Sequence, residues 1–486
     1  MASARDLVEE LRELAARHAG EVTGLELEEA STWCSEVTAT PGGLDGTTYE
    51  LHQRYVRTAG EHVGYARSED ASEPLEELLG EAVRRSRAVA KSDPAGVLLG
   101  ADGAVADGAA ALAAGGGVPA RGAVAPVAGG GDTALDPDAF EVPREDVDSS
   151  ELVRVAREGV RLLLSRAGET KEARCTVRVL EQRRRVTNSA GLARSGSHRH
   201  CLVRLSYIAV GEREMHDVSV RSYAPEPADV DVDELVGRAV ATAEGSLEGG
   251  TIESGRYPVV LSREFACRML VGIWGTLGAE KVATGQSFLA GKVGERVASP
   301  ALSVVSDWRC GCVPGAPGCL PLDAEGCART RRAVVDAGVL AEPLSTLEWG
   351  AGGSAERRDT LGRIVPNDVV CAPGNLYVAP GDASLDELLE RAGDGVYLTD
   401  ISDIYHSFNF ASGGVSTPCR GVRIRDGRLA EPISVVSVSD SLQSLFESVV
   451  ATGRELSWCD LEDLDAYWCG APDMLVSGMS LVGGIA

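Results

Sequence analysis

The spacing of apolar residues in the first half of the chain changes repeatedly between a helical period and a strand period. Apolar positions three and four residues apart predict helices over residues 5–18, 72–90, 149–164 and 231–243. Alternating apolar and polar positions predict strands over residues 49–57, 61–67, 173–182, 184–187 and 201–210. The run from Asn188 to Gly191 supplies a turn between two of these strands. The pattern predicts an α/β N-terminal domain over residues 1–250.

One segment of this first half lacks either period. Residues 94–134 consist mainly of Ala and Gly and contain no aromatic side chain. A segment of this composition cannot bury enough apolar surface to offset the conformational entropy lost on folding. We therefore expect a flexible Ala/Gly-rich insert at about 94–134 within the N-terminal domain.

The second half is rich in short apolar strands and poor in helices. Strands are predicted over residues 257–261, 302–305, 331–335, 339–344, 421–425 and 429–438. Asp426 and Gly427 form a strong hairpin signal because both residues tolerate a positive φ. One helix is predicted over 384–393, where Ser384 and Glu387 form a capping box. Residues 251–486 thus form a predicted β-rich C-terminal domain, and the fold class is α+β.

Charge and composition exclude several classes of protein. The 486 residues carry a formal net charge of −26, which disfavours a nucleic-acid-binding surface or an anionic membrane as partner. The first twenty residues form an amphipathic helical pattern without the apolar core of a signal peptide, and no run of about 18 apolar residues is present. We therefore expect a cytoplasmic protein whose twelve cysteines are reduced thiols rather than a disulfide framework.

Two groups of side chains could bind a metal, but each has a simpler interpretation. Cys310, Cys312, Cys319 and Cys327 do not have the paired C-x₂-C spacing of common zinc sites. An ordinary surface loop with incidental thiols is the favoured interpretation, and a structural zinc or a redox pair is the alternative. His198 and His200 share one strand face and Cys201 lies on the other, for which a solvated strand end is favoured.

Several motif-like stretches occur in a specific order. Residues 270–275 read LVGIWG and residues 293–299 read VGERVAS, and they are followed by 321–326, 334–340, 375–381 and the tail from Cys469 to Gly484. In this order and spacing the stretches resemble the TldD/PmbA family of two-component metallopeptidases. The resemblance implies an α/β N-terminal domain, a β-rich C-terminal domain that carries the metal motif and the dimer interface, and a paired assembly in which one subunit holds the metal.

The metal motif of that family is degenerate in this chain. Active members read H-E-x-x-x-H at this place, which puts Leu270 and Gly275 at the ligand positions and Val271 at the position of the base. Cys469 matches the third ligand. Neither Leu nor Gly can coordinate Zn²⁺, and Val cannot accept a proton. We therefore expect no metal and no catalytic residue in this chain. Positions 270 and 275 are also about 140° apart on an ideal helix, so a shared metal would require local distortion.

The resemblance also implies a role for a metal-free member. This chain would be the non-catalytic subunit of a heterodimeric amide or peptide hydrolase, completing the substrate cleft for an H-E-x-x-x-H-bearing TldD-like subunit that holds the zinc. Tyr405, His406 and Asn409 lie in a segment that lines the family's cleft and could contact substrate. The substrate would be an extended peptide or an amide-containing small molecule, and the Ala/Gly/Arg-rich composition is compatible with an antibiotic or other natural-product pathway.

Two other classes of function remain open. The chain could be a stand-alone enzyme with a different metal site, for example one that uses the thiols of residues 310–327. It could instead be a homodimeric binding protein without any hydrolytic partner. Metal analysis separates the first alternative from the pseudoenzyme hypothesis, and a stable homodimer that ignores metal-bearing relatives would indicate the second.

Overall fold

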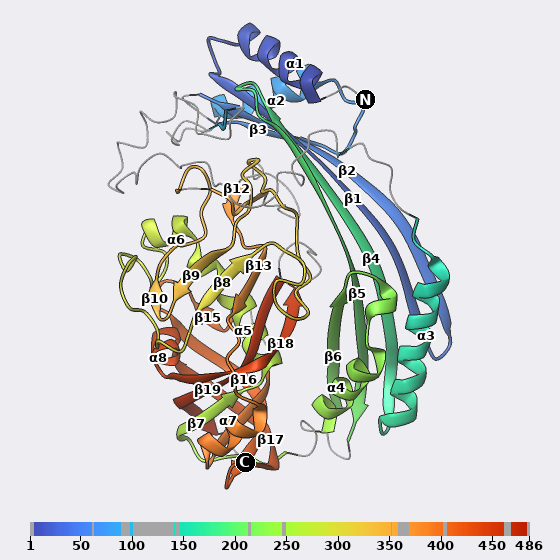
Figure 1. The fold of residues 1–486 in the computed structure, drawn as a ribbon, viewed down its shortest axis with the longest axis vertical. Helices are drawn as coiled ribbons and strands as arrows, with labels where there is room; N and C mark the ends of the chain where they lie inside the picture. The colour runs from blue at the N-terminus through green and yellow to red at the C-terminus, as the bar shows by residue number, and fades with distance from the viewer. Residues whose placement is uncertain are drawn as a thin grey trace.

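The computed structural model describes residues 4–60, 63–88, 98–100, 140, 146–211, 215–244, 249–350, 352–357, 369–401, 406–460 and 468–483. It consists of two lobes, each built around one large sheet (Figure 1). The amino-terminal lobe contains the sheet of residues 24–224, and the carboxyl-terminal lobe contains the sheet of residues 255–483. Among the helices that the structure describes, none combines the length and apolar character needed to cross a membrane.

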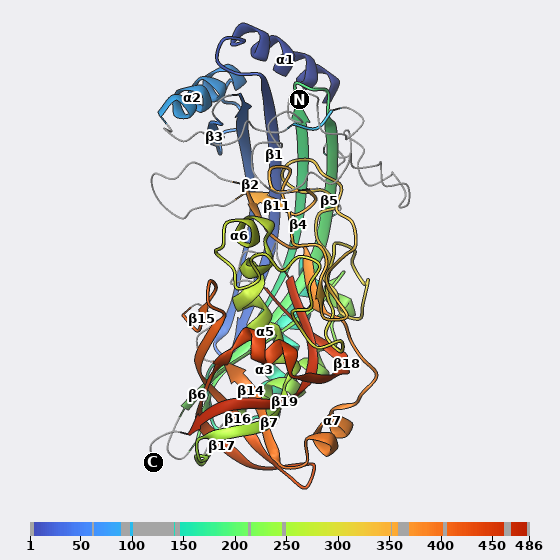
Figure 2. The same cartoon turned by 90° about the vertical axis from the view of Figure 1, so that its left-hand side faces the viewer.

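The sheet of the amino-terminal lobe is long, curved and antiparallel throughout. Its strand order is β3-β2-β1-β4-β5-β6. Figures 1 and 2 show it arching along one side of the other lobe. The elements of this lobe are α1 (Ala4–Arg17), β1 (Gly24–Thr40), β2 (Gly43–Ala59), β3 (Tyr65–Ser68), α2 (Leu75–Ala88), α3 (Ser149–Arg166), β4 (Thr170–Asn188), β5 (Ala193–Val210), β6 (Met215–Ala224), η3 (Pro227–Asp229) and α4 (Val232–Glu244).

The two faces of this sheet have different chemistry because the side chains of β1 alternate. Leu25 and Leu27 pack with α1 and α2, and Val37 packs with α3 at the other end of the same face. Glu26 and Glu28 point to the opposite face, where they are buried with arginine partners. The helices therefore cover one face at its two ends, and the carboxyl-terminal lobe lies against the other face.

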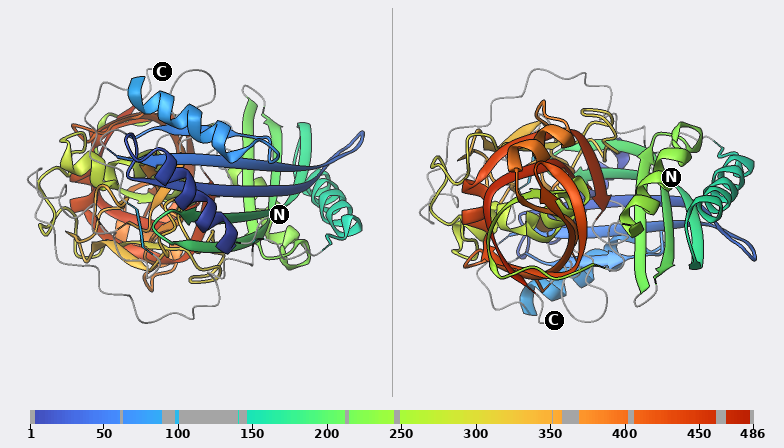
Figure 3. Two further views of the ribbon diagram at one scale, coloured as in Figure 1. Left: turned by 90° about the horizontal axis from the view of Figure 1, so that it is seen from above. Right: turned by 90° about the horizontal axis from the view of Figure 1, so that it is seen from below.

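Part of the second sheet closes on itself. β7 pairs with both β14 and β19, and the path β14-β16-β17-β19 completes a ring, which is visible from below in Figure 3. The elements are β7 (Gly255–Leu261), α5 (Arg263–Ile273), η4 (Trp274–Leu277), α6 (Ala279–Ala283), β8 (Val304–Asp307), β9 (Arg332–Asp336), β10 (Val339–Leu340), β11 (Ala355–Arg357), β12 (Val369–Cys371), β13 (Asn375–Val378), α7 (Leu385–Ala392), β14 (Gly395–Ile401), β15 (Phe408–Asn409), β16 (Gly414–Arg425), β17 (Arg428–Ser441), α8 (Leu442–Glu447), β18 (Val449–Asp460) and β19 (Trp468–Gly483).

The structure confirms the α+β fold class and the positions of the predicted helices α1, α2, α3, α4 and α7. The capping box of Ser384 and Glu387 is formed, and Asp426 and Gly427 both have a positive φ in the predicted hairpin turn. The division of residues 173–187 into two strands is wrong, because β4 runs without a break from Thr170 to Asn188. Most of the predicted insert at 94–134 lies outside the described residues, and the domain boundary near residue 250 stays a prediction.

Candidate functional site

The segment that carries the degenerate motif begins as a regular helix. Ser262 caps α5, and its hydroxyl oxygen accepts a hydrogen bond from the backbone N–H of Phe265 at 3.1 Å. The α-helical hydrogen bonding ends at Ile273, and the chain continues as the 3₁₀ helix η4. Leu270 and Gly275 therefore lie on two different helical segments, which is the local distortion that their angular separation on one ideal helix requires.

Leu270 and Val271 are core residues. Each is only 3 % exposed, and both belong to the main hydrophobic cluster of the carboxyl-terminal lobe. Trp274 is half-buried and packs against the same cluster. Gly275 differs, because a Cβ added to it would meet no atom within 4 Å. Apolar packing thus occupies two positions of the motif, while the third is open enough to accept a side chain.

Cys469 is the one motif position that retains a possible metal ligand. It lies on β19, is 2 % exposed, and burial raises the pKa of its thiol well above the ordinary range. A catalytic zinc needs three protein ligands, and Leu270, Val271 and Gly275 have no donor atom. In the part of the chain that the structure describes, no three His, Cys, Asp or Glu side chains are arranged to hold a metal ion. The hydrolytic zinc of the TldD/PmbA pattern therefore does not fit this donor set.

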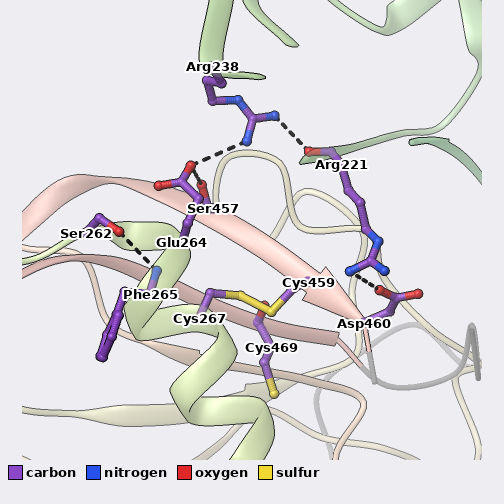
Figure 4. Close-up of a disulfide and its surroundings, with 10 residues drawn as sticks. All are labelled: Arg221, Arg238, Ser262, Glu264, Phe265, Cys267, Ser457, Cys459, Asp460 and Cys469. Carbon is purple, nitrogen blue, oxygen red and sulfur yellow. Dashed lines mark hydrogen bonds and ion pairs between the residues drawn. A yellow bond between two sulfur atoms is a disulfide. The ribbon is translucent and has the colours of Figure 1, made fainter. Parts of the chain in front are cut away.

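A disulfide that the sequence analysis did not predict lies beside this motif. Cys267 of α5 is bonded to Cys459 of β18 across 192 residues of sequence (Figure 4). The expectation that all twelve cysteines are reduced thiols is therefore wrong for these two. No short-range spacing could have indicated the pair, because the residues meet only when α5 packs against β18 and β19.

Two ion pairs join the amino-terminal lobe to α5 and to β18. Glu264 accepts a hydrogen bond from Ser457 at 2.8 Å and lies 3.5 Å from the guanidinium of Arg238 on α4. Arg221 of β6 makes an ion pair with Asp460 of β18 at 3.0 Å. Figure 4 shows these contacts on either side of the disulfide. They fasten the two lobes together at the first turn of α5 and at the end of β18.

Asp473 is a buried carboxylate near the start of α5. Its Oδ1 accepts the backbone N–H of Arg263 at 3.0 Å and the hydroxyl of Tyr397 at 3.4 Å. Burial raises its pKa to about 6, with Glu264 adding to the effect and Arg263 opposing it. The sequence pattern predicted no role for Asp473, although the residue lies within the tail that begins at Cys469.

The predicted cleft residues are separated from the buried motif. Tyr405 lies outside the described residues. His406 and Asn409 are exposed, and Oδ1 of Asn409 accepts the backbone N–H of Ser412 at 3.0 Å. The Asn409 side chain thus closes a local turn. The structure does not bring these residues into the core with Leu270, Val271 and Cys469, and their contact with substrate stays a prediction.

The other candidate metal ligands are distributed over different environments. Cys310 is exposed and Cys312 is half-buried, in agreement with a surface loop, but Cys319 and Cys327 are buried in two different hydrophobic clusters. The solvated strand end predicted for His198 and His200 is also wrong. His200 is 1 % exposed inside β5, its ring stacks on His198 at a centroid distance of 5.3 Å, and burial lowers the pKa of both imidazoles.

Comparison with known proteins relates the carboxyl-terminal lobe to one family. Residues 254–483 match the model described as the PmbA/TldA metallopeptidase C-terminal domain. A metalloprotease from Methanothermobacter thermautotrophicus is 28 % identical over 233 residues, which are 46 % of this chain and 49 % of that protein. The Escherichia coli O157:H7 metalloprotease PmbA is 22 % identical over 232 residues, or 46 % of each chain. The carboxyl-terminal lobe belongs to the TldD/PmbA family.

Solved structures with a similar fold also match the amino-terminal lobe. TldE from Thermococcus kodakarensis superposes with a TM-score of 0.77 at 15 % identity, over 98 % of this chain and 100 % of that one. A Thermotoga maritima protein superposes with a TM-score of 0.75 at 20 % identity and the same coverage. The sequence matches to the curated relatives, in contrast, span only about half the length of those proteins.

Proposed function

We propose that this chain is the non-catalytic subunit of a heterodimeric TldD/PmbA-type amide or peptide hydrolase. The observation that carries the proposal is the replacement of a ligand and of the base by Leu270 and Val271, which are buried in the core of an otherwise complete fold. Apolar side chains at these positions keep the interior close-packed where the family has a metal ligand and the base. Their packing supports a role for the intact scaffold.

The chemistry of the reaction would belong to a partner that carries H-E-x-x-x-H. Its zinc would polarise the scissile carbonyl and activate a water molecule. This chain would complete the cleft and hold an extended substrate, with Tyr405, His406 and Asn409 as the proposed contact residues. Neutral and anionic side chains without a metal can bind and orient a substrate, but they do not replace the Lewis acid.

The proposed substrate is a peptide or a small molecule with an amide bond to a modified amino acid, and the proposed setting is a natural-product pathway in the cytoplasm. The support is the family, in which the relatives named above are metalloproteases, together with the composition of the sequence.

Co-purification with a metal-bearing relative tests the function. The relative alone should be inactive or nearly so, and titration with this chain should restore amide cleavage that saturates near one chain per relative. The matched control is the relative mixed with a variant of this chain that should not assemble or fold, such as Leu270→Asp. Activity of this chain alone at the rate of the mixture would refute the proposal.

A second version of the experiment restores the motif. Gly275 has room for a side chain, whereas Leu270 is packed in the core, so Leu270→His, Val271→Glu and Gly275→His together should not give full activity in the chain alone. Full activity of this triple variant without a partner would show that the ligands were the only missing part, and it would contradict the need for a second subunit.

A further inference from the structure

A polar hollow lies on the carboxyl-terminal lobe between α8 and the strands β7 and β19. It has a volume of about 470 Å³ and is lined by one arginine, one glutamate, one glutamine and four serines. Arg256 belongs to β7 and Ser477 to β19, while the other lining residues belong to α8 or flank it directly (Figure 1). Apolar ligands are bound mainly by burial against apolar side chains. This lining therefore favours a small polar ligand.

The side chain of Arg256 is positioned by β19. A Cβ added to Gly478 would lie 2.8 Å from Nε of Arg256 and 3.4 Å from its Cγ, so the arginine lies close against the backbone of this glycine. Nη2 donates to Oγ of Ser444 at 3.3 Å. Nη1 lies 3.4 Å from both Oδ2 of Asp440 and Oγ of Ser480. These contacts are longer than the usual N–H···O distance of about 2.9 Å, so they orient the guanidinium without saturating it.

Asp440 is hydrogen-bonded mainly to the backbone rather than to Arg256. Its Oδ1 accepts the N–H of Ser441 at 2.8 Å, and its Oδ2 accepts the N–H of Ser480 at 3.0 Å. The Arg256 side chain is 53 % exposed. A guanidinium can bind a carboxylate through two parallel N–H groups. Arg256 can therefore bind the carboxylate of a ligand while Asp440 keeps its backbone donors.

The negative charge of the hollow comes from Glu447. It follows Ser444 by three residues on α8, so the two side chains share one face of the helix. Oε1 of Glu447 accepts a hydrogen bond from Nε2 of Gln443 at 2.9 Å, and the described part of the chain provides no hydrogen bond to Oε2. Because Ser444 also contacts Arg256, a cationic and an anionic side chain border the same hollow.

We propose that this hollow binds a small polar zwitterion, either a free α-amino acid with a polar side chain or a dipeptide of such residues. The ligand carboxylate would accept N–H groups of Arg256, and the ligand ammonium would donate to Oε2 of Glu447. The hydroxyl groups of Ser441 and Ser477 would bind the polar side chain. A ligand without net charge matches one arginine and one glutamate, whereas phosphate or another simple anion would be repelled by Glu447.

The binding site is independent of the heterodimer, because every residue that lines it belongs to this chain. Its use is a separate matter. Cleavage of a peptide releases amino acids or shorter peptides, which are zwitterions, so a role in sensing the product rests on the proposed function. Binding by the isolated chain does not, and its failure would leave the hydrolytic complex untouched.

Isothermal titration calorimetry of the full chain tests the site, with L-serine and the dipeptide Ser-Ser as probes. At least one of these zwitterions should bind with saturation at one per chain. The better zwitterion is then compared with its N-acetyl derivative, which lacks the ammonium, and with its amide, which lacks the carboxylate. Each derivative should bind at least tenfold more weakly. No saturable binding of either zwitterion, or equal affinity for either derivative, would overturn the proposal.

Two variants assign the two ends of the ligand. Arg256→Gln should weaken the zwitterion at least tenfold and leave the affinity of the amide unchanged. Glu447→Gln, at an exposed position that is expected to fold normally, should weaken the zwitterion as strongly and leave the N-acetyl derivative unchanged. Arg425→Gln removes an exposed arginine elsewhere and is the matched control, with unchanged affinity for all probes. Thermal melts check the fold of each variant. Zwitterion binding that survives Glu447→Gln at full affinity would refute the site.

Discussion

Arg184 of β4 and Glu356 of β11 form a two-pronged ion pair across the junction of the two lobes. Nη1 of Arg184 lies 3.2 Å from Oε1 of Glu356, and Nη2 lies 2.6 Å from Oε2. Both residues are buried, and Glu356 also pairs with Arg329 while Arg184 pairs with Glu28. A buried carboxylate from one lobe thus neutralises buried arginines from both lobes.

Removal of this carboxylate should destabilise the chain strongly. Glu356→Ala would leave Arg184 and Arg329 buried beside one fewer counter-charge, which costs on the order of 3–5 kcal/mol in the free energy of unfolding. Urea denaturation followed by fluorescence measures the loss. Glu431→Ala, which breaks the exposed ion pair with Arg425, is the control and should leave the midpoint unchanged. Equal midpoints for the two variants would contradict the interpretation.

The packing of the degenerate motif leads to a second prediction. Leu270→Ala should lower the free energy of unfolding by about 2–5 kcal/mol, because it leaves a cavity in the main core of the carboxyl-terminal lobe. Val293→Ala shortens a residue that is 53 % exposed and should have little effect. Thermal melts of the two variants compared with the wild type would settle the question, and an unchanged melt for Leu270→Ala would argue against the core position.

Stability should depend on pH through Glu325. Burial raises its pKa to about 8, with Asp323 and Glu26 adding to the effect, while Arg57 and the N–H of Leu347 oppose it. A carboxyl group whose pKa is higher in the folded than in the unfolded state binds more protons when the chain is folded. The free energy of unfolding therefore falls as the pH rises from about 4.5 to 8.

Glu325→Gln removes this titration while it keeps the shape and one acceptor oxygen. We expect the melting temperature of the wild type to fall more steeply than that of Glu325→Gln between about pH 5 and pH 8. Glu158→Gln, at an exposed position on α3, is the control and should follow the wild type. Parallel curves for all three proteins would show that Glu325 keeps one protonation state over this range.

The disulfide should make stability sensitive to reduction. Breaking the Cys267–Cys459 link removes a long closed loop from the unfolded chain, so reduction should lower the free energy of unfolding by about 2–5 kcal/mol. Cys459→Ser should melt at the lower temperature with or without reductant. A wild-type melt that reductant leaves unchanged would mean that these two cysteines are not bonded in solution.

The elements that the sequence predicted correctly are those that depend on residues close together in the sequence. The capping box of Ser384 and Glu387 and the turn at Asp426 and Gly427 depend on neighbours within a few residues, and both are present. The absence of zinc ligands at Leu270 and Gly275 could also be inferred from the sequence, because neither side chain has an atom that can coordinate the ion.

Features that depend on distant partners could not be predicted. The three arginines from Arg183 to Arg185 interrupt the apolar alternation of β4 and suggested a break between strands. The strand continues because each arginine has an acidic partner, which is Glu29 of β1 for Arg185, Glu356 of β11 for Arg184 and Glu181 of the same strand for Arg183. The burial of His200 and the pairing of Cys267 with Cys459 likewise depend on contacts between segments far apart in the sequence.

The ring of the carboxyl-terminal lobe constrains the order in which the chain can fold during synthesis. β7 begins at residue 255, but one of its two neighbours is β19, which ends at residue 483. Until the ribosome has released that last strand, one edge of β7 and one edge of β17 are exposed to other chains. The amino-terminal sheet has all of its strands by residue 224 and can form much earlier. The ring would then close beside an amino-terminal lobe that has already folded. The nascent chain would be most prone to aggregation between the folding of that lobe and the closure of the ring.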